Sequence, residues 1–222
     1  MYQRYFKRPL DILLAGAALI VLSPLFLVLA LLVRRKLGAP VIFRQMRPGL
    51  NGRLFPLYKF RSMTDERDAT GALLPDALRL TPFGAALRST SLDELPELWN
   101  VLCGHMSLVG PRPQLIRDMA FFSPEVLRRQ SVWPGLTGLA QINGRNSISW
   151  EDRFAWDLRY VEGVTFAGDI YIMWRTAGKI FTRADIATAG MATAEDYGDY
   201  LLRTGRIGRA EYERIIAEAE RR

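Results

Sequence analysis

The residues best suited to chemistry are two adjacent carboxylates, Asp93 and Glu94, in the middle of the chain. Arginine occurs on both sides of the pair, at Arg88 and Arg112. Nearby positive charge favours the ionised form of a carboxyl group, so we expect both acids to be charged at neutral pH. Such a carboxylate can serve as a nucleophile toward phosphorus, as a metal ligand or as half of a salt bridge. By itself the pair is typical of a solvated helix face, so its meaning depends on the surrounding chain.

Composition and charge limit the classes of function that this chain can serve. The chain has 222 residues, of which 49% are hydrophobic, and its formal net charge is +7. These values exclude a disordered chain and predict an anionic partner such as lipid or nucleotide. Nucleic acid is a weak candidate, because the basic residues are dispersed and no recognition motif appears. One cysteine and one histidine exclude a disulfide within the chain and a Cys/His zinc site, so any metal would be held mainly by oxygen.

An apolar segment near the N-terminus has about the length needed to cross a bilayer as one helix. It covers residues 12–33, and basic residues flank both of its ends. Ser23 and Pro24 stand at its centre, where proline removes a backbone hydrogen bond and bends a helix. The positive-inside rule would place both flanks in the cytoplasm. We therefore expect residues 1–37 to form a re-entrant helix-break-helix anchor, with a single spanning helix as the alternative.

The rest of the chain predicts an α/β fold that is mostly α. We expect a small globular domain over residues 38–185 and a helical tail over residues 186–222. Two apolar runs, residues 41–43 and 54–60, are joined by a turn rich in glycine, asparagine and proline, which is typical of a β-hairpin. Pro56 marks an edge position in the second strand.

The carboxylate pair is expected near the start of a helix. One helix should begin at Pro82 and the next should cover residues 93–101. The apolar side of this second helix would carry Leu95, Leu98, Trp99 and Leu102. Backbone N–H groups and the helix dipole favour anions at a helix start, so a phosphate bound there would meet both acids directly.

Arginine is also carried by turns and by glycine-rich stretches. Arg112 lies between two prolines, which fix the backbone and can aim a guanidinium group at phosphate oxygens. The stretches 133–138 and 141–146 are rich in glycine, and the second carries Arg145. Such stretches serve as plain turns more often than as phosphate cradles.

Two further segments complete the chain. Over residues 166–181, apolar residues recur at helical spacing, which fits either a core-facing helix or an amphipathic helix at a membrane interface. The tail shows a capping pattern at residues 193–196 and then a charged helix, and we see no chemistry in it.

Short motifs follow one another in a fixed order along the first 185 residues. They are Lys7-Arg8-x-x-Asp11, the Ser23-Pro24 break, Phe43-x-Gln45-x-Arg47-x-Gly49, Tyr58-Lys59-Phe60-Arg61-Ser62-Met63, Arg88-x-x-Ser91-Leu92-Asp93-Glu94-Leu95-Pro96, Asn100-Val101-Leu102, Gly110-Pro111-Arg112-Pro113, Pro134-Gly135-x-Thr137-Gly138 and Gln141-x-Asn143-Gly144-Arg145. This series resembles the bacterial sugar transferase family, and within it the small, PglC-like monotopic phosphoglycosyl transferases. The tail from Thr193 onward falls outside the resemblance.

The resemblance implies an enzyme that moves a phosphosugar from a UDP-sugar to polyprenyl phosphate, usually undecaprenyl phosphate, with magnesium and with release of UMP. It implies that Asp93 is the nucleophile of a covalent aspartyl phosphosugar intermediate, and that Glu94 helps to bind Mg²⁺ beside it. A single-step ternary-complex transferase, with Asp93 as base or metal ligand, is one alternative. A non-catalytic, membrane-anchored nucleotide-sugar binder is another.

Further site residues follow from the same resemblance. The cations expected on the diphosphate and uridine side are Lys59, Arg88, Arg112 and Arg145. Lys7 and Arg8 are placed where a polyprenyl phosphate head group would meet the membrane surface. Asp157 and Asp169 match family carboxylates, which either bind substrate or orient arginines.

The resemblance also implies a place and a substrate class. It implies the cytoplasmic face of the bacterial inner membrane, with a phospholipid bilayer as partner. The leading sugar donor is a UDP-N-acetylated sugar, with UDP-N,N'-diacetylbacillosamine as one example. One departure from the family stands at His105, where relatives usually carry an acid, and we expect His105 to pack or cap locally. Cys103 is expected to face solvent or a core edge.

Overall fold

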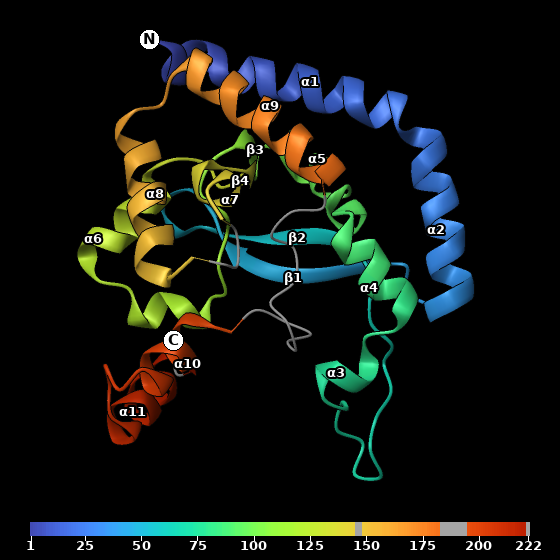
Figure 1. Ribbon diagram of the computed structural model, residues 1–222, viewed down its shortest axis with the longest axis vertical. Helices are drawn as coiled ribbons and strands as arrows, with labels where there is room; N and C mark the ends of the chain where they lie inside the picture. The colour runs from blue at the N-terminus through green and yellow to red at the C-terminus, as the bar shows by residue number, and fades with distance from the viewer. Residues whose placement is uncertain (145–147, 183–194, 221–222) are drawn as a thin grey trace.

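The computed structural model describes residues 1–144, 148–182 and 195–220, and most of these residues are helical (Figure 1). The helices are α1 Lys7–Val21, α2 Ser23–Leu37, α3 Asp76–Arg79, α4 Pro82–Ser89, α5 Glu97–Leu102, α6 Pro124–Leu127, α7 Leu139–Ile142, α8 Trp150–Glu162, α9 Phe166–Thr182, α10 Tyr197–Arg203 and α11 Arg209–Glu220. The strands are β1 Ile42–Pro48, β2 Leu54–Phe60, β3 Ser107–Val109 and β4 Gly135–Thr137.

A bent pair of helices, α1 and α2, forms the N-terminal part. The two helices meet at an angle of 64°. No single helix among the described residues is long and apolar enough to cross a membrane, although this pair meets the same criterion when taken together. The Ser23 hydroxyl donates to the Ile20 carbonyl at 2.8 Å, which is the carbonyl that Pro24 cannot serve because it has no N–H. The predicted break is confirmed, and the segment is not one straight helix.

Both N-terminal helices contribute to the hydrophobic cores on one side and expose apolar residues on the other. Ala15 of α1 packs with residues of β2 and α5, and three residues of α2 pack with Phe60 and Leu87. These three are Leu29, Val33 and Leu37. Each of the two clusters therefore combines residues of the predicted anchor, 1–37, with residues of the predicted globular domain, 38–185. The opposite faces of α1 and α2 leave large apolar residues such as Ile20 and Leu27 exposed.

The expected β-hairpin is confirmed. β1 and β2 pair antiparallel, with Ile42 opposite Phe60 and Pro48 opposite Leu54. Asn51 and Gly52 both have positive φ in the connecting turn. The first strand runs on to Pro48, which makes it longer than the apolar run 41–43 that predicted it.

A second, unpredicted strand pair underlies the Arg112 turn. β3 and β4 pair in parallel, so the glycine-rich stretch 133–138 is partly a strand rather than only a loop. The backbones cross very closely: a Cβ on Gly138 would lie 2.2 Å from the carbonyl oxygen of Gly110. The next glycine-rich stretch, residues 141–146, begins inside α7. These glycines therefore serve backbone packing beneath the turn that carries Arg112.

The helix predicted over residues 93–101 is divided. Leu92–Glu94 is a short 3-10 turn, and Ser91 before it has a left-handed conformation with a φ of 55°. α5 begins only at Glu97, after Pro96. Trp99 was expected on the apolar side, but it is 53% exposed while Leu98 faces the core.

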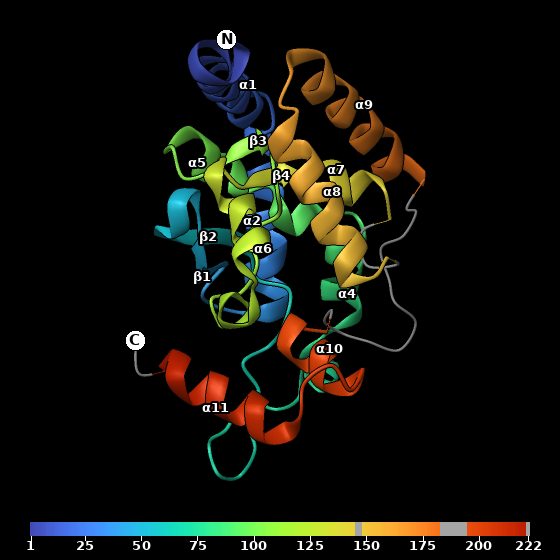
Figure 2. The same cartoon turned by 90° about the vertical axis from the view of Figure 1, so that its left-hand side faces the viewer.

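Helix α9 lies beside α1 on the same side of the molecule (Figures 1 and 2). Its inner face buries Asp169 and Ile172. Ile170 and Trp174 are 45% and 69% exposed, so the core-facing interpretation is wrong for these two residues. The side chain of Phe181 lies outside the described residues.

The C-terminal helices α10 and α11 fold back on the body of the protein. They contact the segment Arg117–Phe121 and lie at the opposite end of the molecule from α1 (Figure 2). The predicted charged helix is present as α11. The start of the capping pattern, residues 193–194, lies outside the described residues.

Candidate active site

Asp93 is buried where three elements meet. The 3-10 turn Leu92–Glu94 packs against α4 and β2, and the Asp93 residue is only 7% exposed. Glu97, one turn further along, is also buried and adds a third carboxylate to the pair seen in the sequence. Glu94 and Glu97 share one partner, because Lys59 Nζ lies within 3.1 Å of both carboxylates.

Glu94 is clamped by two cations. Lys59 Nζ lies 2.9 Å from Glu94 Oε1, and the Arg112 guanidinium group donates to both carboxylate oxygens of Glu94. Lys59 also lies 3.1 Å from Glu97 Oε1. Lys59 of β2 and Arg112 of the turn between two prolines thus meet at one carboxylate.

The two adjacent acids titrate very differently. Burial, and then the neighbouring charge of Glu94, raises the pKa of Asp93 to about 7. Burial would also raise the pKa of Glu94, but Arg112 and Lys59 outweigh it and hold that pKa well below its usual range. The expectation that both acids are ionised at neutral pH is therefore wrong for Asp93, which is about half protonated there.

Arg88 lies close enough to Asp93 to favour its ionised form. The positive charges of Arg88, Lys59 and Arg112 all lower the pKa of Asp93. Arg88 Nε donates to the Ser62 hydroxyl at 2.8 Å, which ties α4 to the chain leaving β2. Arg88 therefore belongs to the same cluster as Asp93, as expected. Arg145 lies outside the described residues.

A buried asparagine positions the strand that carries Lys59. Asn100 is fully buried on α5, its Nδ2 donates to the Pro56 carbonyl at 2.6 Å, and its Oδ1 accepts from the Tyr58 N–H at 3.0 Å. The side-chain amide therefore pairs with a backbone carbonyl and a backbone N–H of β2, as a neighbouring strand would. Asn100 appeared in the sequence only as part of a motif, and its positional role was missed.

A buried arginine, Arg129, holds the backbone of Arg112 in place. Arg129 Nη2 donates to the Arg112 carbonyl at 2.7 Å, and the same guanidinium group pairs with Asp157 at 2.6 Å. Tyr160, one turn after Asp157 on α8, donates to the carbonyl of Val109 at 2.9 Å. Of the two roles considered for Asp157, the geometry is that of a carboxylate orienting an arginine. Arg129 itself was not expected from the sequence.

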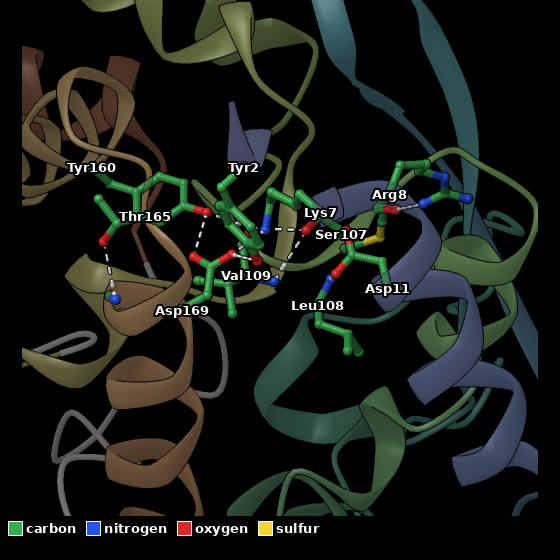
Figure 3. A network of polar contacts seen from close by, with 12 residues as sticks. Tyr2, Lys7, Arg8, Asp11, Ser107, Leu108, Val109, Tyr160, Thr165 and Asp169 are labelled. Atoms are coloured by element: carbon green, nitrogen blue, oxygen red, sulfur yellow. Dashed lines mark hydrogen bonds and ion pairs between the residues drawn. The ribbon is translucent and has the colours of Figure 1, made fainter. Parts of the chain in front are cut away.

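Lys7 and Asp169 form a separate buried network between α1 and α9 (Figure 3). Lys7 Nζ lies 2.6 Å from Asp169 Oδ2, and both side chains are 3% exposed. Tyr2 donates to the same carboxylate at 2.7 Å, and the Tyr160 hydroxyl lies 2.9 Å from its other oxygen, so the single Tyr160 proton is shared between Asp169 and the Val109 carbonyl. Nearby, Asp11 Oδ1 accepts from the Leu108 N–H at 3.1 Å. Asp169 thus pairs with a lysine and with tyrosine hydroxyl groups, rather than with an arginine.

Arg8 is committed to the end of α5. It donates to the carbonyls of Val101, Leu102 and Met106, the last at 2.8 Å. This use is typical of a cation that caps the last turn of a helix. Both Lys7 and Arg8 therefore have partners within the protein, and contact of either with a lipid phosphate stays a prediction.

The two unusual residues after α5 are placed as expected. His105 stacks on the ring of Phe55, with ring centroids 5.6 Å apart. Cys103 is an exposed free thiol. Neither has a position among the carboxylates and cations around Asp93.

The donor chemistry around Asp93 suits an ion that substrate phosphates help to bind. Within the described part of the chain, no group of three or more Asp, Glu, His or Cys side chains could hold a metal by itself. Magnesium usually takes one or two carboxylates together with phosphates and water. Asp93 and Glu94 offer such a pair, although Glu94 is also engaged by Lys59 and Arg112.

Comparison with known families gives one match over most of the chain. The sequence model of a family described as bacterial sugar transferase matches residues 2–183. A relative from Bacillus subtilis (strain 168), named uncharacterized sugar transferase EpsL, is 48% identical over 191 residues, which cover 86% of this chain and 95% of the relative.

Two further relatives carry more specific names. The UDP-glucose:undecaprenyl-phosphate glucose-1-phosphate transferase of Klebsiella pneumoniae is 41% identical over 79% of this chain. The undecaprenyl-phosphate galactose phosphotransferase of Salmonella typhimurium is 40% identical over 82% of this chain. The aligned region spans only 40% and 41% of these two longer proteins.

Proposed function

The chain belongs to the bacterial sugar transferase family, and from this we propose that it transfers a sugar 1-phosphate from a UDP-sugar to undecaprenyl phosphate or a related polyprenyl phosphate. The names of the Klebsiella and Salmonella relatives support this class of reaction. The observation that carries the proposal is Asp93, a buried carboxylate beside a second carboxylate that two cations clamp.

In the proposed first step, a carboxylate oxygen of Asp93 attacks the phosphorus that bears the sugar. The bond from this phosphorus to the bridging oxygen breaks, and UMP leaves with the electron pair. In the second step, an oxygen of the lipid phosphate attacks the same phosphorus and releases the Asp93 carboxylate. Two displacements mean that the two large substrates never have to be aligned together.

Positive charge around Asp93 supports this chemistry. Lys59 and Arg112 already hold an anion, the Glu94 carboxylate, and both can turn part of their donor capacity toward a diphosphate. Arg88 favours the ionised, reactive form of Asp93. When bound by Asp93 and Glu94, Mg²⁺ would supply further neutralisation of phosphate charge.

Two experiments separate this mechanism from its alternatives. Incubation with UDP-sugar alone should give a mass increase of one phosphosugar on the intact protein, located on Asp93. Asp93→Asn should keep nucleotide-sugar binding and lose UMP release. Full activity without any adduct would favour a single-step ternary complex, and binding without turnover by the unaltered protein would favour a non-catalytic binder.

We further propose that α1 and α2 form a re-entrant anchor on the cytoplasmic face of the inner membrane. The exposed apolar faces of α1, α2 and α9, with Trp174 among their residues, support this placement. In a protein whose Cys103 is replaced by serine, single cysteines at Gln3 and Lys36 should both react from the cytoplasmic side. Reaction from opposite sides would show a spanning segment instead.

The sugar remains to be assigned by assay. The named relatives indicate glucose and galactose as donors for those proteins, while the predicted donor for this chain carries an N-acetyl group. A panel of UDP-glucose, UDP-galactose, UDP-N-acetylated hexoses and UDP-N,N'-diacetylbacillosamine, assayed with undecaprenyl phosphate and magnesium for UMP release, distinguishes these classes.

A further inference from the structure

Arg129 lies against the rings of Phe122 and Phe154, which form an aromatic box next to the backbone of Arg112. The residue is 3% exposed, and its guanidinium carbon lies 5.9 Å from the ring centroid of Phe122 and 5.8 Å from that of Phe154. Inside this box it pairs with Asp157 and donates to the Arg112 carbonyl. Rings around a cation exclude water, which strengthens its remaining electrostatic and hydrogen-bonding contacts.

The C-terminal segment supplies one wall of this aromatic cluster. The Tyr197 ring lies 5.7 Å from Phe122 and 5.0 Å from Phe154, measured between centroids. Its N–H donates to the buried carboxylate of Asp118 at 2.9 Å. The next residue, Gly198, fits so closely that a Cβ there would lie 2.6 Å from the Phe121 ring.

This docked segment lies beyond the region that the family model matches, which ends at residue 183. We propose that residues 195–203 act as a positioning element for Arg112. Tyr197 completes the packing around Phe122 and Phe154, these rings hold Arg129 in place, and Arg129 fixes the carbonyl of Arg112. Arg112 in turn sets the clamp on Glu94. The proposal rests on the proposed function for its activity readout.

The first test compares Tyr197 with Tyr212, a tyrosine of the neighbouring helix α11. Tyr197→Ala should lower kcat/KM for UMP release about tenfold, because small displacements of a binding group are costly to catalysis. Tyr197→Phe keeps the ring and should restore activity to within about twofold of the unaltered protein. Tyr212→Ala is the matched control: Tyr212 stacks on Phe121 and bonds Asp199, outside the box, and its loss should change activity by less than about twofold.

A double-mutant cycle separates positioning from general weakening of the fold. In an Arg112→Lys background, whose residual rate is the new baseline, Tyr197→Ala should cost less than about twofold if it acts through Arg112. The same tenfold loss in both backgrounds would overturn the proposal. So would a loss that Tyr197→Phe fails to restore, or an equal loss in Tyr212→Ala. All variants are assayed well below their unfolding temperatures.

Hydrogen exchange provides a readout that does not need turnover. Tyr197→Ala should speed amide exchange in the peptide that contains residues 110–115 by at least about tenfold, and Tyr212→Ala should leave it unchanged. Unchanged exchange in Tyr197→Ala would contradict the proposed positioning. If the unaltered protein releases no UMP from any donor, the proposed function fails, while the exchange experiment still decides the role of Tyr197.

Discussion

The protonation of Asp93 should set the pH dependence of the proposed first half-reaction. With the pKa of Asp93 raised to about 7, roughly a tenth of this side chain is ionised at pH 6 and roughly nine tenths at pH 8. Only the carboxylate attacks phosphorus, so kcat/KM for UMP release should rise about tenfold between these two values.

Glu94→Gln should move this transition. The substitution removes the neighbouring charge that raises the pKa of Asp93 and leaves Lys59 and Arg112 free to face it. Two unit charges ~6 Å apart at an effective dielectric of ~20 interact by ~3 kcal/mol, or ~2 pKa units. The midpoint should therefore fall to about pH 5, and the rise between pH 6 and 8 should shrink below about twofold, whatever the absolute rate.

The assay measures UMP by rapid quench without lipid acceptor, at the lowest magnesium concentration that supports the reaction. Glu97→Gln is the matched control, because Glu97 is buried beside the same Lys59 but its charge is not among the largest influences on the pKa of Asp93. Its midpoint should stay near that of the unaltered protein. A flat profile from pH 5 to 8 in the unaltered protein, or an unmoved midpoint in Glu94→Gln, would refute the role given to burial and to Glu94.

Three further predictions concern stability and are read from denaturant unfolding. Asn100→Leu leaves the half-buried Pro56 carbonyl and Tyr58 N–H without their partners, and should cost about 2–4 kcal/mol. Asp169→Leu leaves Lys7 unpaired and should cost about 3–5 kcal/mol, a loss that adding Lys7→Met should partly recover; a larger loss in the double variant would contradict this. Gly138→Ala should cost about 1–3 kcal/mol because of its clash with Gly110, whereas Gly178→Ala, with open space on α9, should be neutral or stabilising by up to about 1 kcal/mol.

Local signals were sufficient for several parts of the fold. The break at Ser23-Pro24 follows from the chemistry of proline, and the hairpin from a turn between two apolar runs. Arg112 was expected near the acids because it follows them closely in the sequence, and it donates to Glu94. In each case the residues that determine the structure lie within a few positions of one another.

Long-range packing determines the parts that the sequence did not predict. The pKa of Asp93 depends on its burial, which residues distant in sequence create. The partners Lys7 and Asp169 are separated by 162 positions, and Arg129 and Asp157 by 28. β3 and β4 are too short to show a strand period in the sequence. Only their pairing in the structure explains why glycine is required at the positions around them.

Helices α1 and α2 pack into the protein core on one side and expose apolar residues on the other, which affects how the protein folds. Because these helices contribute Ala15, Leu29 and Val33 to the interior, the body of the protein has an incomplete core until they are in place. With α1 and α2 as the proposed membrane anchor, insertion of this anchor and folding of the remainder should be a single coupled event. A chain synthesised without residues 1–37 should expose Phe60 and Leu87 and aggregate, and an unrelated hydrophobic segment of equal length should not rescue it.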